Sequence, residues 1–114
     1  MPDILRVYIA GPYTHGDVAV NVRQAVLAGI EILEAGHVPF IPHLYHFAHC
    51  LVPQSYETWT TLDLQWLDVC HCLLRLAGHS PGADREVERA RELGLPIYHC
   101  LEDCLRALPQ GVTL

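Results

Sequence analysis

The segment LAGHSPGADREVERARELGLP, from Leu76 to Pro96, leads from the end of a short apolar strand through a loop of small residues into a helix. Ser80 suits the N-cap of this helix, and Pro81 suits its first position, where a missing N–H removes no hydrogen bond. Gly94 ends the helix. The segment therefore has the order of strand, loop and helix from which parallel α/β sheets are built.

One carboxylate of this helix lies on its apolar side. At about 100° per residue, apolar and charged side chains fall on opposite faces. The apolar stripe contains Ala83, Val87, Ala90 and Leu93, whereas the solvated face contains Asp84, Glu88 and Glu92. Glu86 falls inside the apolar stripe, where a carboxylate is costly unless a charged or hydrogen-bonding group meets it. Glu86 is therefore either a side chain that bends out to solvent or a functional acid.

The segment SYETWTTLDLQWLDVC, residues 55–70, predicts a second helix with the same feature. Ser55 can cap this helix. Its apolar stripe contains Trp59, Leu62, Trp66, Val69 and Cys70, and its polar face contains Glu57 and Asp68. Asp63 lies within the stripe, between Trp59 and Leu67. Because each helix carries one acid on its buried face, the sequence predicts that Asp63 and Glu86 form a functional pair.

Strands and helices alternate along the chain. We expect strands over residues 5–10, 37–41, 71–76 and 95–98, and helices that begin at Val18, Ser55, Pro81 and Leu101. Residues 42–54 are predicted as a loop, and Pro39 places the second strand near a sheet edge. The alternation predicts a single domain over residues 1–114, with a doubly wound, Rossmann-like or flavodoxin-like parallel sheet of four to five strands and helices on both faces.

The loops that follow the first three strands have the sequences GPYTHGD, PHLYHFAH and AGHSPGAD. In open parallel sheets, ligands bind outside the carboxyl ends of the strands. These three loops therefore predict one shared crevice, and Glu86 can point into it from the helix that leaves the third loop.

Composition restricts the kinds of partner. With 114 residues, 51% hydrophobic and 18% charged, the chain is typical of a folded domain. A net charge of −6 argues against an extended nucleic-acid groove, although one small anionic ligand is compatible with it. No apolar run reaches the length of a membrane span, and the first residues lack the pattern of a signal peptide. We expect a cytoplasmic protein that binds neither membranes nor nucleic-acid polymers.

The cysteines and histidines raise the question of metal binding. Cys50, Cys70, Cys72, Cys100 and Cys104 follow no regular spacing, so they are predicted to be small core residues rather than disulfides or zinc ligands. His43, His46 and His49 are three residues apart, and three histidines can form a hydrolytic zinc centre. A metal-dependent hydrolase is therefore an alternative, but the favoured interpretation includes no metal and no cofactor, because His43 follows Pro42 in a predicted loop.

Four segments together carry a resemblance to a known family: VYIAGPYT, GHVPFIPH, DLQWLDVCHCLLRL and SPGADREVERARELGLPI. They resemble the nucleoside 2-deoxyribosyltransferase superfamily over Val7 to Tyr98, and in particular its small bacterial and phage branch related to nucleoside 5′-monophosphate N-glycosidases. Members of the superfamily cleave the N-glycosidic bond of nucleosides or nucleoside 5′-monophosphates. They pass the sugar to another base or to water.

The resemblance implies roles for particular residues. Glu86 matches the nucleophile of the family and Asp63 its second acid. Gly11, Pro12 and Tyr13 match its ligand-facing first loop, Tyr8 matches an aromatic residue of the first strand, and Ser80 and Gly82 match positions that face a 5′-hydroxyl or 5′-phosphate. His71 stands where relatives usually carry an acid. Relatives complete their site with a residue from a neighbouring subunit, so we expect a homodimer or a higher homo-oligomer.

Further residues are candidates for binding the substrate. Thr14, His15, Arg23, Ser80 and the N–H of Gly82 can anchor a 5′-phosphate, because the start of a helix binds anions. Arg23 can equally be an exposed residue of the first helix, and Ser80 only a helix cap. Tyr13 can stack on a base or pack against its neighbours. His43, after the second strand, is a further candidate for substrate binding.

We therefore expect cleavage of the N-glycosidic bond of a nucleoside or a nucleoside 5′-monophosphate, either by hydrolysis or by sugar transfer. Glu86 acts as the nucleophile, which the N-terminus of its helix helps to keep ionised. Asp63 either protonates the departing base or orients the sugar hydroxyls. The alternatives from other classes are a nucleotide-binding module without chemistry, a metal-dependent hydrolase and a hydrolase of a larger dinucleotide such as NAD.

Overall fold

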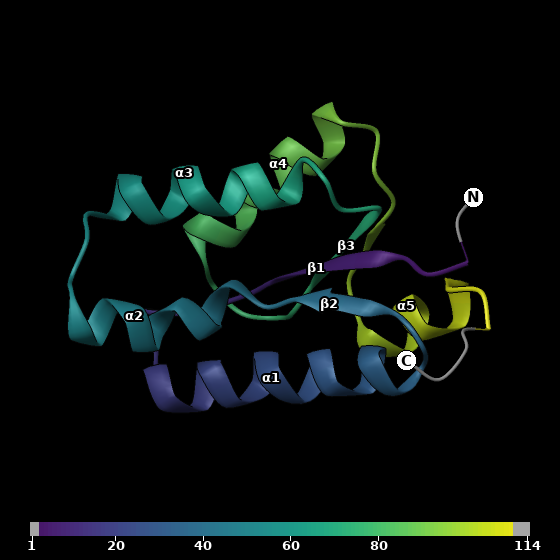
Figure 1. Ribbon diagram of the computed structural model, residues 1–114, viewed down its shortest axis with the longest axis horizontal. Coiled ribbons are helices and arrows are strands. Elements are labelled where there is room, and N and C mark those ends of the chain that lie inside the picture. Colours follow the sequence, from purple (N-terminus) through teal and green to yellow (C-terminus); the bar gives the residue numbers. More distant parts are fainter. Residues whose placement is uncertain (1–2, 111–114) are drawn as a thin grey trace.

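The computed structural model describes residues 3–110 of the chain and contains one sheet of four parallel strands (Figure 1). The strands are β1 (Arg6–Ala10), β2 (Val38–Phe40), β3 (Cys72–Arg75) and β4 (Ile97–Tyr98), and their order in the sheet is β2-β1-β3-β4. The helices are α1 (Val18–Glu34), the 3-10 helix η1 (Pro42–Leu44), α2 (Tyr45–Leu51), α3 (Tyr56–Leu67), α4 (Pro81–Glu92) and α5 (Leu101–Ala107). This architecture confirms the predicted doubly wound α/β fold.

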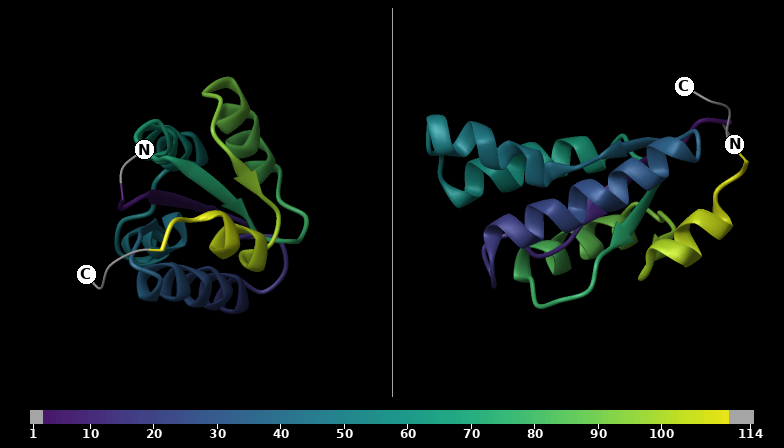
Figure 2. Two further views of the ribbon diagram at one scale, coloured as in Figure 1. Left: turned by 90° about the vertical axis from the view of Figure 1, so that its right-hand side faces the viewer. Right: turned by 90° about the horizontal axis from the view of Figure 1, so that it is seen from below.

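Helices cover both faces of the sheet, as Figure 2 shows in its end-on view. Successive side chains of a strand point to opposite faces. Val7 and Ile9 of β1 therefore pack with α1 and α5, whereas Tyr8 and Ala10 pack with α3 and α4. The sheet separates the two hydrophobic cores. The position of a residue in β1 therefore determines which core its side chain joins.

The residues predicted to begin and end helices are confirmed. The Ser80 hydroxyl accepts a hydrogen bond from the N–H of Ala83 at 3.1 Å, and that of Ser55 accepts one from Thr58 at the same distance. Gly36, directly after α1, has φ +90°, a left-handed conformation that glycine adopts without steric cost. These caps fix where α4 and α3 begin, and they thereby place the acids of both helices.

The prediction of a loop over residues 42–54 is wrong, because η1 and α2 occupy most of this segment. Pro42 is the first residue of η1, a position that proline tolerates because the N–H there has no helical partner. The proline therefore begins the helical segment instead of preventing it. As a consequence, α2 adds a wall to one end of the sheet that the sequence interpretation lacked.

The predicted apolar stripe of α3 is partly wrong. Trp66 is 47% exposed and Val69 is 49% exposed, while Thr60 and Leu67 are buried. The helix ends at Leu67, so the helical wheel no longer applies to Val69. Trp66 instead covers the ring of Phe40 from outside, with 5.4 Å between ring centroids.

The prediction for the cysteines holds for three of the five. Cys70, Cys72 and Cys104 are buried in the two cores. Cys50, on α2, and Cys100, the residue before the first turn of α5, are exposed. All five are free thiols. Among residues 3–110, no helix is both long and apolar enough to cross a membrane.

β2 forms one edge of the sheet, as Pro39 indicated. The N–H of Val38 donates a hydrogen bond to the carbonyl of Leu5 at 2.9 Å, next to β1. Because the N–H groups of a strand alternate in direction, the nitrogen of Pro39 faces away from β1. The proline therefore removes no hydrogen bond from the sheet.

Candidate active site

A pocket of about 540 Å³ lies at the carboxyl ends of β1, β2 and β3. Its wall is formed by the loop after β1, by η1, α2 and α3, and by the first two turns of α4. Most of the predicted site residues line it: Gly11, Tyr13, Thr14, His15, His43, Asp63, Ser80, Gly82 and Glu86. The three loops predicted to share a crevice therefore do so, and the two acids of α3 and α4 face the same space.

Glu86 is the most buried acid of the pocket, with 9% of its surface exposed. Its carboxylate oxygen Oε2 accepts a hydrogen bond from the hydroxyl of Tyr8, which lies on the central strand β1 and is fully buried. The alternation of side chains along β1 turns Tyr8 toward α4, where Glu86 projects from the second turn. Tyr8 does not line the pocket itself, so it acts on the pocket through Glu86.

Burial raises the pKa of Glu86 to about 8. The hydrogen bond from Tyr8 and the charge of Arg75 lower it, whereas the nearby Asp63 raises it. The expectation that the start of α4 keeps this carboxylate ionised is therefore wrong. Glu86 is the sixth residue of the helix, beyond the first turn in which the helix dipole is strong, and desolvation outweighs it.

Asp63 lies on α3 and is half-buried. Its oxygen Oδ1 is buried and has no hydrogen-bond partner among residues 3–110. Desolvation raises the pKa of Asp63 to about 7. The pocket therefore holds a second carboxyl group that can carry a proton near neutral pH, and that has an oxygen ready to contact a ligand.

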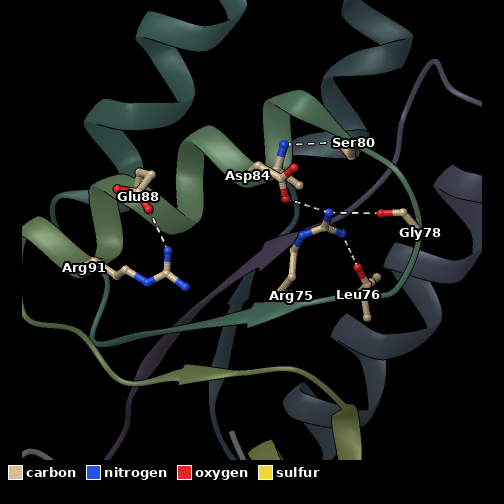
Figure 3. A network of polar contacts seen from close by, with 8 residues as sticks. Arg75, Leu76, Gly78, Ser80, Asp84, Glu88 and Arg91 are labelled. Carbon is tan, nitrogen blue, oxygen red and sulfur yellow. Dashed lines mark hydrogen bonds and ion pairs between the residues drawn. The ribbon is translucent and has the colours of Figure 1, made fainter.

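The loop between β3 and α4 is held in place by Arg75, the last residue of β3 (Figure 3). The Arg75 guanidinium donates hydrogen bonds to the carbonyl of Leu76, to that of Gly78 at 2.9 Å and to the carboxylate of Asp84 at 3.0 Å. Its side chain is only 12% exposed. Because Asp84 belongs to the first turn of α4, these bonds fix the loop against the helix that carries Glu86.

The loop after β1 forms the opposite rim. The hydroxyl of Tyr13 lies 2.6 Å from Nδ1 of His46 on α2, and Tyr13 also lines the pocket. Thr14 and His15 are exposed at the rim, where the ring of His15 lies edge-on to that of His79 at 4.8 Å. Pro12 contributes its carbonyl, which lies 2.9 Å from Nε2 of His43.

Arg23 is not brought into the site. It is exposed on α1 and does not line the pocket. The helical wheel explains why: Val22, Ala25 and Ala28 turn toward the sheet, which leaves Arg23 on the solvated side of the helix. Arg23 is therefore the exposed surface residue that the alternative interpretation described.

Part of the wall was not predicted from the sequence as a binding surface: aromatic and polar residues of α2, of α3 and of the segment between them. They are Tyr45, His46, His49, Gln54, Tyr56 and Thr60, and Trp59, which was interpreted only as a core residue. The indole N–H of Trp59 donates a hydrogen bond to Nδ1 of His49 at 2.8 Å, so the two helices meet across this wall. The three-residue spacing of the histidines was the available signal for α2.

The histidines do not form the metal centre of the alternative hypothesis. Among residues 3–110, no group of three histidine, cysteine, aspartate or glutamate side chains is placed to hold a metal ion. Nε2 of His43 already faces a carbonyl, and Nδ1 of His49 accepts bonds from Trp59 and from the backbone of Gln54. These side chains organise the pocket wall.

The parallel strand order and the helices on both faces define a doubly wound α/β protein with a pocket at the carboxyl ends of its strands. A solved structure of the 2-deoxyribosyltransferase from the psychrotolerant bacterium Bacillus psychrosaccharolyticus is similar to this chain, with a TM-score of 0.58 and 18% sequence identity. The similarity covers 96% of this chain and 99% of that one. The chain belongs to the family described as Domain of unknown function (DUF7768), whose model matches residues 5–100. No curated protein matches the chain.

Proposed function

We propose that this protein cleaves the N-glycosidic bond of a nucleoside or a nucleoside 5′-monophosphate, with Glu86 as the nucleophile. One observation carries the proposal: two carboxyl groups, Glu86 and Asp63, line one pocket at the carboxyl ends of the strands, and Tyr8 orients the more buried one. The fold shared with a 2-deoxyribosyltransferase supports it.

The proposed reaction has two steps. In the first, a carboxylate oxygen of Glu86 forms a bond to C1′ of the sugar while the bond from C1′ to the base nitrogen breaks. The electron pair of that bond goes to the base, which takes a proton from the carboxylic acid of Asp63. In the second step, water or another base attacks C1′ and releases the Glu86 carboxylate, and a proton returns to Asp63.

The burial of both acids suits this division of roles. The pKa of Asp63, raised to about 7, lets it hold a proton where an exposed aspartate is ionised. Glu86 must be ionised to attack, and its raised pKa makes it a stronger base and nucleophile once it is. The positive charge that develops on the sugar favours the ionised form of Glu86 in the transition state.

The walls of the pocket suggest how a nucleoside lies in it. Ser80 and Gly82, at the start of α4, offer a hydroxyl and an N–H to the 5′ end of the sugar, and Thr14 and His15 lie at the same rim. Tyr45, Tyr56 and Trp59 on the other wall provide aromatic surface for a base.

That a second copy of the chain completes the site stays a prediction. Light scattering of the purified protein tests whether the chain forms the oligomer that this requires.

The decisive experiment is chromatography for free base after incubation with a panel of nucleosides and nucleoside 5′-monophosphates, with and without an acceptor base. We expect release of base from at least one class. A new nucleoside that appears only with the acceptor identifies a transferase. Glu86→Gln should release no base under the same conditions, and Glu88→Gln, an exposed acid of the same helix, is the matched control. Ligand binding without release of base would instead favour the non-catalytic nucleotide-binding module.

A further inference from the structure

His43, in the wall of the pocket, carries a hydrogen-bond acceptor without a partner among residues 3–110. Its side chain is 5% exposed and lines the pocket after the end of β2. Nδ1 is buried and has no hydrogen-bond partner among residues 3–110. Buried polar atoms in folded proteins nearly always have a partner, so such an atom in a pocket wall points to a ligand that supplies one.

A backbone contact of His43 determines whether Nδ1 needs a hydrogen-bond donor or an acceptor as its partner. Nε2 of His43 lies 2.9 Å from the carbonyl oxygen of Pro12. A carbonyl can only accept, so Nε2 must carry the proton, and Nδ1 of the neutral ring then presents a lone pair. Burial lowers the pKa of His43, against the carbonyls of Pro12 and Gly11, which raise it. The ring therefore stays neutral near pH 7, and Nδ1 is an acceptor.

The order of the strands places this acceptor on the base side of the pocket. Glu86 and Ser80 follow β3, His43 follows β2, and β1 lies between these two strands. Adjacent strands are about 4.8 Å apart, so the ends of β2 and β3 are separated by roughly 10 Å. A nucleoside whose C1′ lies at Glu86 directs its base, and not its sugar hydroxyls, toward the end of β2.

We propose that His43 is a specificity-determining residue whose Nδ1 accepts a hydrogen bond from the exocyclic amino group of the substrate's nucleobase. Adenine, cytosine and guanine carry such a group. This inference rests on the proposed function for the orientation of the ligand. It adds that the site selects amino-substituted bases.

The test compares each amino-substituted nucleoside or 5′-monophosphate with the analogue that carries hydrogen in place of the amino group. For each pair, kcat/KM is measured for cleavage, and Kd is measured by equilibrium dialysis with Glu86→Gln protein. His43→Gln keeps an N–H for the Pro12 carbonyl but places no acceptor at the position of Nδ1. His43→Asn does the reverse, because its oxygen occupies that position. The ratio between variant and parent cancels the intrinsic reactivity of each base.

We expect the parent to prefer the amino-substituted ligand about tenfold. His43→Gln should lose this preference and His43→Asn should retain most of it. A preference that is unchanged in His43→Gln, or one that follows the 2′- or 3′-hydroxyl in ribose and deoxyribose pairs, overturns the inference.

Cleavage without a preference for the amino group overturns this inference alone. Selective binding without release of base overturns the proposed function and leaves this inference standing. Failure to bind any nucleoside or nucleotide overturns both.

Discussion

The hydroxyl of Tyr8 donates a hydrogen bond to the carboxylate of Glu86, across 78 residues of sequence. The two side chains join the central strand to the helix that covers it. Burial, together with the charge of Glu86, raises the pKa of Tyr8 well above its usual value, so the hydroxyl keeps its proton and remains a donor. A rigid strand therefore sets the direction of the proposed nucleophile.

Replacing Tyr8 with phenylalanine removes this donor and keeps the packed ring. Because the hydrogen bond lowers the pKa of Glu86, the break in the pH–rate profile that reports Glu86 should move to higher pH in Tyr8→Phe. We expect kcat to fall about tenfold or more while KM changes little, since a misdirected carboxylate affects the transition state more than binding. Steady-state kinetics between pH 5 and 9 check this. An unchanged pH–rate profile would contradict the assigned role of Tyr8.

The two acids predict a bell-shaped pH profile. Activity requires Glu86 to be ionised and Asp63 to be protonated, and their pKa values are raised to about 8 and about 7. In Asp63→Asn the alkaline limb should disappear because the group that loses a proton there is gone. The remaining limb should then report the ionisation of Glu86 alone, whose pKa is no longer raised by the charge of Asp63.

The rate of Asp63→Asn at its optimum should fall by about 10²- to 10⁴-fold for a natural base, the usual contribution of a general acid. A nucleoside with an activated leaving group needs little protonation, so its loss should be much smaller. Equal losses for both kinds of substrate would mean that Asp63 orients the sugar and does not supply the proton. Asp68→Asn, near the end of the same helix and exposed, is the control.

Glu86 should make the protein less stable as the pH rises. Its pKa is about 8 in the folded protein and about 4.5 in the unfolded chain, so between these values the folded state holds a proton that the unfolded state has lost. The free energy of unfolding then falls with increasing pH, by up to about 1.4 kcal/mol per pH unit. Asp63 contributes with the same sign.

Glu86→Gln removes the charge and should therefore raise the midpoint of thermal unfolding at pH 8, by about 4 °C or more, and change it little at pH 5. Differential scanning calorimetry at the two pH values measures the effect. Equal shifts at both values would show that glutamine acts through packing. The comparison therefore tests whether Glu86 is buried without requiring that the protein catalyse any reaction.

Arg75 should separate the effect of charge from that of the loop contacts. Arg75→Lys keeps a positive charge but cannot bond the carbonyls of Leu76 and Gly78 and the carboxylate of Asp84 together. Arg75→Met loses both. Because the charge of Arg75 lowers the pKa of Glu86, only Arg75→Met should move the break that reports Glu86 to higher pH. Both variants should raise KM, since the loop that carries Ser80 loosens. A KM equal to that of the parent in both would show that the contacts in Figure 3 do not shape the pocket.

The features that could be predicted from the sequence are local ones. A cap such as Ser80 and a stripe such as Ala83, Val87 and Ala90 depend on neighbours within a turn, so they identified α4 and the buried position of Glu86. The parallel sheet and the crevice followed from the alternation of elements, whereas the order of the strands came only from the structure. The partner of Glu86 was not accessible in this way, because a helical wheel gives a direction and not the residue that is met there.

The remaining errors have physical causes. Residues 42–54 were predicted as a loop, although the start of a helix accepts a proline such as Pro42, so α2 and its part of the pocket were missed. The pKa of Glu86 depends on how deeply the side chain is buried and on Tyr8, Asp63 and Arg75 around it, and a helical wheel gives neither. The free lone pair of His43 depends on the carbonyl of Pro12, 31 residues away.

The place of Pro39 in β2 bears on how copies of this chain can associate. An exposed strand edge is a template on which another molecule can add a strand, which is how many proteins begin to form fibrils. The outward position of this three-residue edge has no N–H to offer, because proline occupies it. The addition of another strand to β2 is therefore disfavoured. Copies of the chain that associate through the surfaces of their helices do so without competition from strand pairing at this edge.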